Sequence, residues 1–161
     1  NLSTEGEVHH HSYTPTEDHL PHVVDFIPEK LDAVSISTAP VLVVAGKGAC
    51  SPSSMPMLQK LADLVGGMVA CSRPVVEAGL MPYERQVGLT GKTVAPKLYI
   101  GIGVSGAVQH LVGIQGSAKI VAINLDPNAP IFNVADVGLV GDYLDVVPAL
   151  IAGLKKRLKR E

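Results

Sequence analysis

Residues 97–113, with the sequence KLYIGIGVSGAVQHLVG, carry the pattern that is most informative about the fold. The stretch opens with an apolar run that is typical of a strand buried on both faces. It then passes through Gly101, Gly103 and Gly106 into a segment with helical spacing. We therefore predict a strand over 97–103 and a helix over 105–113, joined by a glycine-rich turn.

The same alternation of apolar runs and amphipathic segments continues along the rest of the chain. Strands that are apolar throughout and alternate with helices are typical of a parallel sheet that is covered on both faces. We predict an α/β fold with a doubly wound, mainly parallel sheet and helices on both faces, a Rossmann-like nucleotide-binding architecture. The further strands are expected at 40–46, 68–71, 119–124 and 137–140, and the further helices at 57–65, 72–79 and 144–158.

Composition excludes several classes of protein. Only 17% of the 161 residues are charged and 47% are hydrophobic, which is the opposite of a disordered chain. No apolar run approaches the roughly 18 residues that a membrane span needs, so no membrane insertion is expected. The net charge of −2 conceals a sum of −6 over residues 1–32 and of +4 over residues 155–161. The basic end continues an apolar helical stripe without stacking aromatic residues, so we expect it to offset a helix dipole and to bind no nucleic acid.

The cysteines and histidines indicate neither a disulfide scaffold nor a metal centre. Cys50 and Cys71 are too few for a disulfide framework and lack metal-site spacing, which favours a reducing compartment such as the cytoplasm or the mitochondrial matrix. Five of the six histidines fall within the first 22 residues. Consecutive histidines on an extended segment point to opposite sides, so we expect an arm and no metal site.

The pattern Gly101-x-Gly103-x-x-Gly106 follows a strand and is expected to open a helix, which is the context in which it binds a nucleotide. Glycines lack the Cβ atom that would keep a pyrophosphate away from the backbone N–H groups. Asp126 ends the next strand, where an acid suits the ribose of NAD. A dehydrogenase with a bound NAD is therefore one candidate, and a tight turn without a ligand is another.

The same segment comes close to the nucleophile elbow G-x-S-x-G. Its last glycine is replaced by Ala107, and the only histidine after Ser105 is His110, five residues later on the same predicted helix. In the fold that carries this elbow, the triad runs along the chain in the order Ser, acid, His, and the histidine comes from a separate element. Hydrolytic function is therefore disfavoured.

Several other polar residues follow predicted strands or lie in the turns near them. In an open α/β sheet, ligands bind in the crevice outside the carboxyl ends of the strands. Side chains from several loops are therefore expected to converge on one place. These side chains are Arg73, Thr90, Gln109, His110, Asn124 and Asp142.

Long stretches around these residues resemble the C-terminal FAD domain of electron transfer flavoprotein α subunits. The stretches include CSRPVVEAG (71–79), QVGLTGKTVAPKLYIGIGVSGAVQHLVGI (86–114) and IVAINLDPNAPIFNVADVGLVGD (120–142). The resemblance implies an FAD-binding domain at 41–161, preceded at 1–40 by the extended end of another domain and a linker. It also implies an electron carrier rather than an enzyme, in a heterodimer with the electron transfer flavoprotein β subunit. The donors would be dehydrogenases and the acceptor a quinone-reducing flavoprotein or a similar protein.

The resemblance further implies a role for individual residues. Arg73 is expected against the isoalloxazine, Thr90 near the N5 atom of that ring and His110 near its C2 carbonyl. The segment from Ser105 to His110 is expected at the pyrophosphate and the pyrimidine edge. The cofactor-binding residues that the resemblance implies are Lys47, Ser72, Arg73, Val87, Gly88, Leu89, Thr90, Ser105, Gly106, Ala107, Val108, Gln109, His110, Asn124, Asp142 and Tyr143.

Two residues depart from the pattern of that family. Leu89 stands where the family usually has Gln, which removes one polar group beside the ring. Lys47 stands where the first glycine-rich turn usually has Arg, which leaves a point charge in place of a bidentate fork. Beside the flavin carrier, an NAD-binding dehydrogenase domain and a cofactor-free interaction module of the same fold remain as alternatives.

Overall fold

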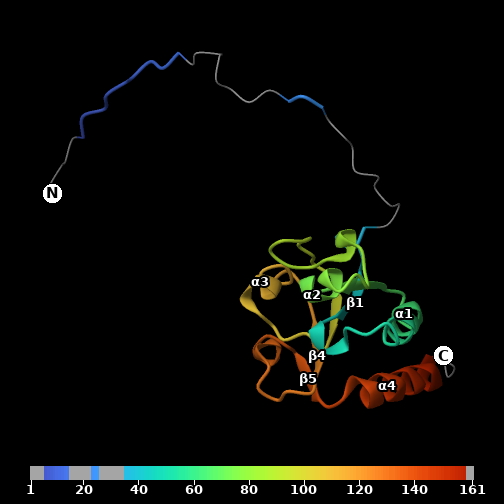
Figure 1. The fold of residues 1–161 in the computed structure, drawn as a ribbon. Coiled ribbons are helices and arrows are strands. Elements are labelled where there is room, and N and C mark those ends of the chain that lie inside the picture. The colour runs from blue at the N-terminus through green and yellow to red at the C-terminus, as the bar shows by residue number, and fades with distance from the viewer. Residues whose placement is uncertain (1–5, 15–22, 26–34, 159–161) are drawn as a thin grey trace, which may run out of the picture. The chain divides into compact units, whose positions relative to one another are not determined.

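The computed structural model in Figure 1 describes residues 6–14, 23–25 and 35–158. The chain divides into two units, residues 1–30 and residues 31–161. In the first unit, the described residues form neither helix nor strand. The second unit contains every helix and strand that the structure describes.

A parallel sheet of five strands lies at the centre of the described part of the second unit, as the apolar runs predict. Its order is β2-β1-β3-β4-β5, and all neighbouring strands are parallel. The winding reverses between β1 and β3, which is the point where open sheets of this kind bind ligands. The strands are β1 (Val41–Ala45), β2 (Met68–Cys71), β3 (Leu98–Ile102), β4 (Ile120–Asn124) and β5 (Val137–Val140).

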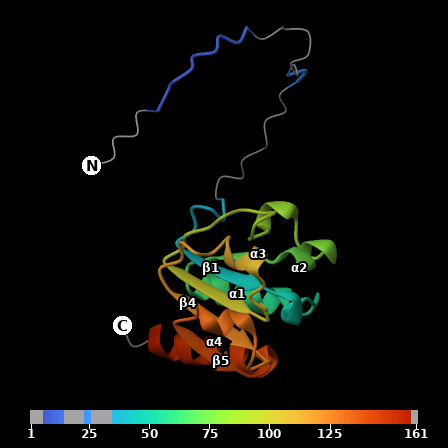
Figure 2. The ribbon, with the colours of Figure 1, turned by 90° about the vertical axis from the view of Figure 1, so that its left-hand side faces the viewer.

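Helices cover the two faces of the sheet unequally. α1 (Met55–Leu64) and α4 (Tyr143–Leu158) pack against each other; α1 also contacts β1 and β2, and α4 contacts β4. The short α3 (Val108–Leu111) lies on the other side of the sheet from α1, as Figures 1 and 2 show together. The described residues also form α2 (Arg73–Glu77) and the 3₁₀ turns η2 (Lys47–Ala49), η3 (Tyr83–Arg85) and η4 (Pro130–Asn133).

Each face of the sheet buries its own apolar cluster. On β1, Leu42 and Val44 belong to one cluster, and Val43 and Ala45 belong to the other. Successive side chains of a strand point to opposite faces, so both kinds of position must be apolar when both faces are covered. This double burial explains why β1 reads as a continuous apolar run.

The last strand and the last helix are less buried than the other predicted elements. β5 lies at the edge of the sheet, and each of its residues is exposed. On α4, Val147 and Ile151 are buried, whereas Leu144 and Leu158 are about half exposed. The apolar pattern therefore predicted the position of these elements correctly but overstated their burial.

The helix predicted over 105–113 is wrong in its bounds. An extended loop covers residues 104–107, and the helix itself is the single turn α3. Gly106 has a φ of +85°, which is incompatible with a right-handed helix. The backbone N–H of Ile131 also donates to the carbonyl of Ser105 at 3.0 Å. Contact with η4 therefore keeps the glycine turn extended, and the turn does not itself form the N-terminus of a helix.

The packed body begins before the first strand. Ile36 and Ala39 are 2% and 5% exposed and belong to one of the two core clusters. The carbonyl of Pro40 accepts hydrogen bonds from the backbone N–H groups of Lys97 and Leu98. Residues just before Val41 are thus part of the folded unit.

Both cysteines are free thiols. Cys71 ends β2 in the core, and Cys50 is partly buried. Burial, assisted by the nearby Cys50, raises the pKa of Cys71 to about 12. Cys71 therefore stays protonated at neutral pH and is a poor nucleophile.

The described residues contain neither a helix that could span a membrane nor a cluster of metal-binding side chains. No helix among them is long and apolar enough to cross a bilayer. No group of three or more His, Cys, Asp or Glu side chains among the same residues could hold a metal ion. His19 and His22, from the predicted histidine-rich arm, lie outside the described residues.

Candidate functional site

A cavity of about 300 Å³ opens beside α2 and α3, and we call it the Arg73 cavity. Its walls come from the start of α2, from the turn after η3 and from the region of α3. Every lining residue is among those predicted from the sequence. They are Arg73, Val87, Gly88, Leu89, Thr90, Ala107, Gln109 and His110.

A second cavity of about 160 Å³, here called the Asn124 cavity, lies at the carboxyl ends of β3, β4 and β5. Three of its lining residues, Asn124, Asp142 and Tyr143, were predicted. The others are Gly48, Gly103, Ile123, Leu125 and Gly141. The loop from Gly103 to Ala107 supplies residues to both cavities, so it runs from one to the other.

The turns after β1 and β3 are in direct backbone contact at the point where the winding reverses. The N–H of Gly48 donates to the carbonyl of Gly103 at 2.9 Å. Gly103 has a φ of +64°, and a Cβ there would lie 2.6 Å from the backbone nitrogen of Ala49. Only glycine suits this position, because a side chain would separate the two turns.

Five of the predicted residues line neither cavity. Ser105 and Gly106 lie on the loop between the cavities, with Gly106 packed against η4. Ser72 immediately precedes Arg73 and is buried. The remaining two, Lys47 and Val108, have exposed side chains.

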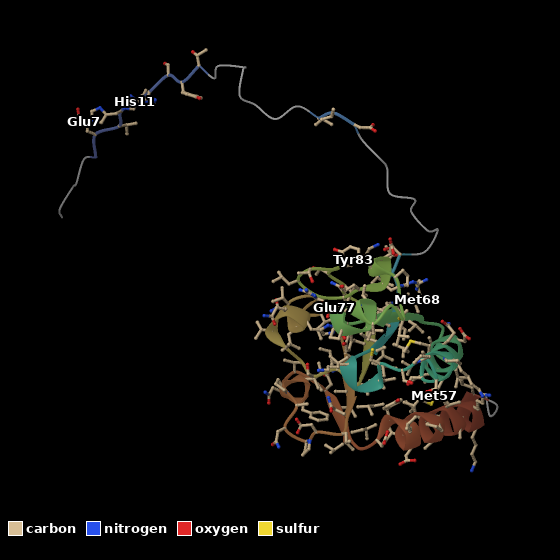
Figure 3. The ribbon with its side chains drawn as sticks, viewed as in Figure 1. Glu7, His11, Met57, Met68, Glu77 and Tyr83 are labelled. Carbon is tan, nitrogen blue, oxygen red and sulfur yellow. The ribbon has the colours of Figure 1, made fainter. Side chains whose placement is uncertain are left out.

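A larger groove of about 600 Å³ lies between α1 and α4. Its lining includes Met57, labelled in Figure 3, together with Pro148 and Ala152. None of the predicted residues lines it. The polar residues of the groove are Ser53, Lys60 and Lys155. The Arg73 cavity instead combines a guanidinium, a hydroxyl, an amide and an imidazole, and such a varied polar set is characteristic of a cofactor site.

Two side chains that the sequence did not single out hold Thr90 in place. The amide Nε2 of buried Gln86 donates to Thr90 Oγ1 at 2.9 Å. The hydroxyl of Tyr83 donates to the Thr90 carbonyl at 2.6 Å. Because Thr90 Oγ1 accepts from Gln86, its own proton is free to be donated to a ligand. Gln86 was part of the quoted stretch, but nothing in its spacing marked it as a support for Thr90.

Arg73 supplies a cation at the rim of its cavity. Its Nε lies 2.8 Å from Oε1 of Glu77, one helical turn later on α2 (Figure 3 labels Glu77). The Arg73 side chain remains 64% exposed, and the ion pair leaves its terminal nitrogens available. The preceding Ser72 has a buried Oγ without a hydrogen-bond partner among the described residues.

His110 is buried at the wall of the Arg73 cavity. Its Nε2 lies 2.8 Å from the hydroxyl of Tyr99, and its Nδ1 has no partner in hydrogen-bonding geometry among the described residues. Burial lowers the pKa of His110 to about 4, and a weaker hydrogen-bond interaction with the Val87 backbone, too poor in geometry to satisfy Nδ1, raises it slightly. The imidazole is therefore neutral at pH 7.

We expect acid to destabilise the domain through His110. Between pH 6.5 and pH 4 the unfolded chain binds a proton on this residue and the folded chain does not, because the folded pKa is about 4. The free energy of unfolding therefore rises with pH across this window, by up to about 3 kcal/mol. Urea unfolding at a series of pH values should show that the free energy of unfolding depends less on pH in His110→Gln than in the wild type. Identical pH dependences would contradict a lowered pKa at His110.

At the Asn124 cavity the polar side chains are largely engaged with the backbone. Asn124 donates from Nδ2 to the carbonyl of Val104 at 2.8 Å and accepts the N–H of Asp126 at 3.0 Å. Asp126, the candidate ribose ligand of an NAD enzyme, accepts the N–H of Asn128 and does not line the cavity. The placement of Asn124 therefore suits a ligand contact better than that of Asp126.

Comparison with known proteins decides the family. The family model "Electron transfer flavoprotein FAD-binding domain" matches residues 35–115, about half of the chain. The chain belongs to this family. The match covers β1 through α3 and with them every residue that lines the Arg73 cavity, whereas most of the Asn124 cavity lies beyond it.

Curated relatives agree with the family assignment. The chain is 46% identical over 134 residues to the electron transfer flavoprotein subunit alpha of Thermoanaerobacterium thermosaccharolyticum, covering 83% of this chain and 41% of that protein. It is 50% identical over 125 residues to protein FixB of Rhizobium meliloti, covering 78% of this chain and 35% of that protein. It is 50% identical over 128 residues to the mitochondrial electron transfer flavoprotein subunit alpha of Dictyostelium discoideum, covering 80% of this chain and 36% of that protein. The matched part of the chain thus spans 35–41% of the length of these relatives.

The residues of this electron transfer flavoprotein domain fit FAD on physical grounds. Two buried polar atoms at the Arg73 cavity or next to it, Ser72 Oγ and His110 Nδ1, lack partners among the described residues. Buried polar groups are nearly always hydrogen-bonded, so such atoms suit a site where a polar ligand completes them. Two cavities joined by an open backbone loop also suit a long ligand with a ring at one end and a nucleotide at the other.

Proposed function

We propose that this domain binds FAD and carries electrons, as part of an electron transfer flavoprotein α subunit. The observation that supports this most strongly is the composition of the Arg73 cavity. It combines a cation at Arg73, a hydroxyl donor at Thr90 and a neutral imidazole at His110 with walls of backbone and apolar side chains. Such a cavity matches the polar edge and the flat apolar faces of a flavin ring.

The residues of the cavity would each perform a distinct task. FAD, when bound, supplies the one- and two-electron chemistry, and the protein sets its potential through charge and hydrogen bonds. Arg73 would stabilise negative charge on the N1–C2=O edge, where His110 would also contact the ring. The Thr90 hydroxyl would donate a hydrogen bond near N5. Leu89, 63% exposed at the cavity, would leave that side of the ring without a polar partner.

The rest of the cofactor would extend along the open loop toward the Asn124 cavity. The segment from Ser105 to His110 would hold the pyrophosphate with backbone N–H groups of its extended part, residues 105–107, and of the first residues of α3. Lys47, exposed on η2, would add a positive charge there. Asn124, Asp142 and Tyr143 would contact the adenosine end.

The whole protein would work as a heterodimer with an electron transfer flavoprotein β subunit. Dehydrogenases would donate the electrons, and a quinone-reducing flavoprotein or a similar protein would accept them. The resemblance implies a domain boundary at residue 41, but Ile36 and Ala39 belong to the core of the folded unit, so the FAD domain would begin a few residues earlier. The end of a preceding domain with its linker would lie before it. We infer a reducing compartment, the cytoplasm or the mitochondrial matrix, because both thiols are free.

The visible spectrum of the purified chain tests this function. After incubation with FAD and removal of free cofactor, we expect the chain to retain flavin absorption bands at about 370 and 450 nm, which belong to the cofactor itself. A chemical reductant should bleach these bands, and air should restore them. A chain that stays colourless after FAD and binds NAD instead would contradict the proposal and favour a dehydrogenase domain. A chain that binds neither would favour an interaction module.

A further inference from the structure

A buried pair of side chains connects the sheet to the wall of the Arg73 cavity. Tyr99 on β3 is completely buried, and its hydroxyl lies 2.8 Å from Nε2 of His110 on α3. The two rings meet edge to face, with centroids 6.2 Å apart and an interplanar angle of 62°. Tyr99 itself does not line the cavity.

The strand is shaped to let Tyr99 make this contact. Gly101 is two residues further along β3, so it faces the same side of the sheet. A Cβ at Gly101 would lie 2.8 Å from Cε1 of Tyr99 and 3.3 Å from its hydroxyl oxygen. The missing side chain leaves the space in which the Tyr99 ring lies against the strand.

The protons of this pair can be assigned by accounting for every donor. Burial raises the pKa of Tyr99 and lowers that of His110 to about 4, so both side chains are neutral at pH 7. No other acceptor for the Tyr99 hydroxyl proton exists among the described residues. If Nε2 carried the imidazole proton, the phenol proton would be left in the core without an acceptor, at a substantial desolvation cost. Tyr99 therefore donates to Nε2, and the imidazole proton lies on Nδ1.

This assignment gives the unpartnered atom of His110 a definite chemical character. Nδ1 meets the geometry of a hydrogen bond with none of the described residues, although the ring also interacts weakly with the Val87 backbone. As an N–H group it can only donate. We propose that Tyr99 is a positioning residue that fixes the ring orientation and the Nδ1–H tautomer of His110, so that the cavity presents a neutral donor to a carbonyl of the flavin. The flavin part of this inference rests on the function proposed above.

The tautomer can be measured directly by ¹H–¹⁵N NMR of the histidine rings in the full chain without cofactor. The His110→Gln variant identifies the His110 signals. We expect Nδ1–H with an unprotonated Nε2 in the wild type, and a shift toward Nε2–H in Tyr99→Phe, which keeps the ring and removes the hydroxyl. Nε2–H in the wild type overturns the proposal without any variant. An unchanged tautomer in Tyr99→Phe also overturns it.

The effect on the flavin is measured by comparing affinities for oxidised and reduced FAD. The loss of one neutral hydrogen bond changes a dissociation constant by about fivefold. Tyr99→Phe should therefore raise the dissociation constant of reduced FAD about fivefold relative to that of oxidised FAD. In a His110→Phe background the same substitution should have no further effect on this ratio. An equal effect in both backgrounds would show that Tyr99 acts through packing alone and would overturn the positioning role. If the chain binds no FAD, the proposed function fails, while the NMR measurement still decides the tautomer.

Discussion

Replacing Gly103 by alanine should destabilise the domain by about 3 kcal/mol or more. The residue has a φ of +64°, which costs an L-residue about 1–2 kcal/mol. Its new Cβ would also lie 2.6 Å from the nitrogen of Ala49 and 2.7 Å from the carbonyl carbon of Gly48. Both contacts are with backbone, which cannot move aside as a flexible side chain does, and overpacking of this kind adds about 1–3 kcal/mol.

Gly66→Ala is a matched control for this experiment. Gly66 has the same φ of +64°, but a Cβ there meets no atom within 4 Å. It should therefore show only the conformational cost, about 1–2 kcal/mol. Urea denaturation of both variants measures the two free energies of unfolding. Equal losses would contradict the view that close contact between the β1 and β3 turns makes glycine necessary at Gly103.

Arg73→Ala should give the largest change in the redox behaviour of bound FAD, a fall in midpoint potential of tens of millivolts. Reduction places negative charge on the N1–C2=O edge of the ring, and a nearby cation stabilises that charge. Since the Arg73 side chain is 64% exposed, we expect an effect on the order of 1 kcal/mol. For a one-electron couple, about 1.4 kcal/mol corresponds to about 60 mV. Spectroelectrochemistry of the FAD-loaded chain measures the shift.

Two variants separate charge from packing in this measurement. Arg73→Lys keeps the charge and should retain most of the potential, although it loses the fork geometry. Glu77→Gln removes the anion that lies 2.8 Å from Arg73 and should leave the potential equal or higher. The shift in Arg73→Ala should also decrease in high salt. An unchanged potential in Arg73→Ala with FAD still bound would exclude an electrostatic role for this residue.

The strands were predictable because burial on both faces leaves a local signature. β1 and β3 are continuous apolar runs in the sequence, and their residues pack into both core clusters. Helix α1 was predictable from its apolar spacing, and its buried residues, which include Leu58 and Leu61, follow that spacing. Periodicity alone does not report how much of an edge element is covered, which is why the exposure of β5 was not foreseen.

The loop before α3 could not be predicted from local pattern, because a distant contact determines it. Ser105 is held by the backbone of Ile131, and Gly106 is packed against the same residue. A glycine-rich turn after a strand is compatible with either a helix or an extended loop. The contact with η4, distant in sequence, selects the extended loop.

The members of the Arg73 cavity were predicted from motif resemblance, but the residues that support them were not. Gln86 fixes Thr90, and Tyr99 contacts His110 from inside the core. Spacing and composition do not show which side chain will meet which across a fold. Gly101 could have indicated the position of the Tyr99 ring, because a glycine within a buried strand often marks a place where another group lies close to the backbone.

The location of the flavin in the Arg73 cavity is tested by calorimetric titration of the full chain with FAD, using two tryptophan variants that fill different cavities. Ala107 lines the Arg73 cavity and Ala152 lines the groove between α1 and α4, and both are exposed alanines. We predict one FAD per chain for the wild type and for Ala152→Trp, and loss of binding for Ala107→Trp with its thermal unfolding unchanged. FAD binding that survives Ala107→Trp, or that is lost only in Ala152→Trp, would contradict the assignment of the flavin to the Arg73 cavity.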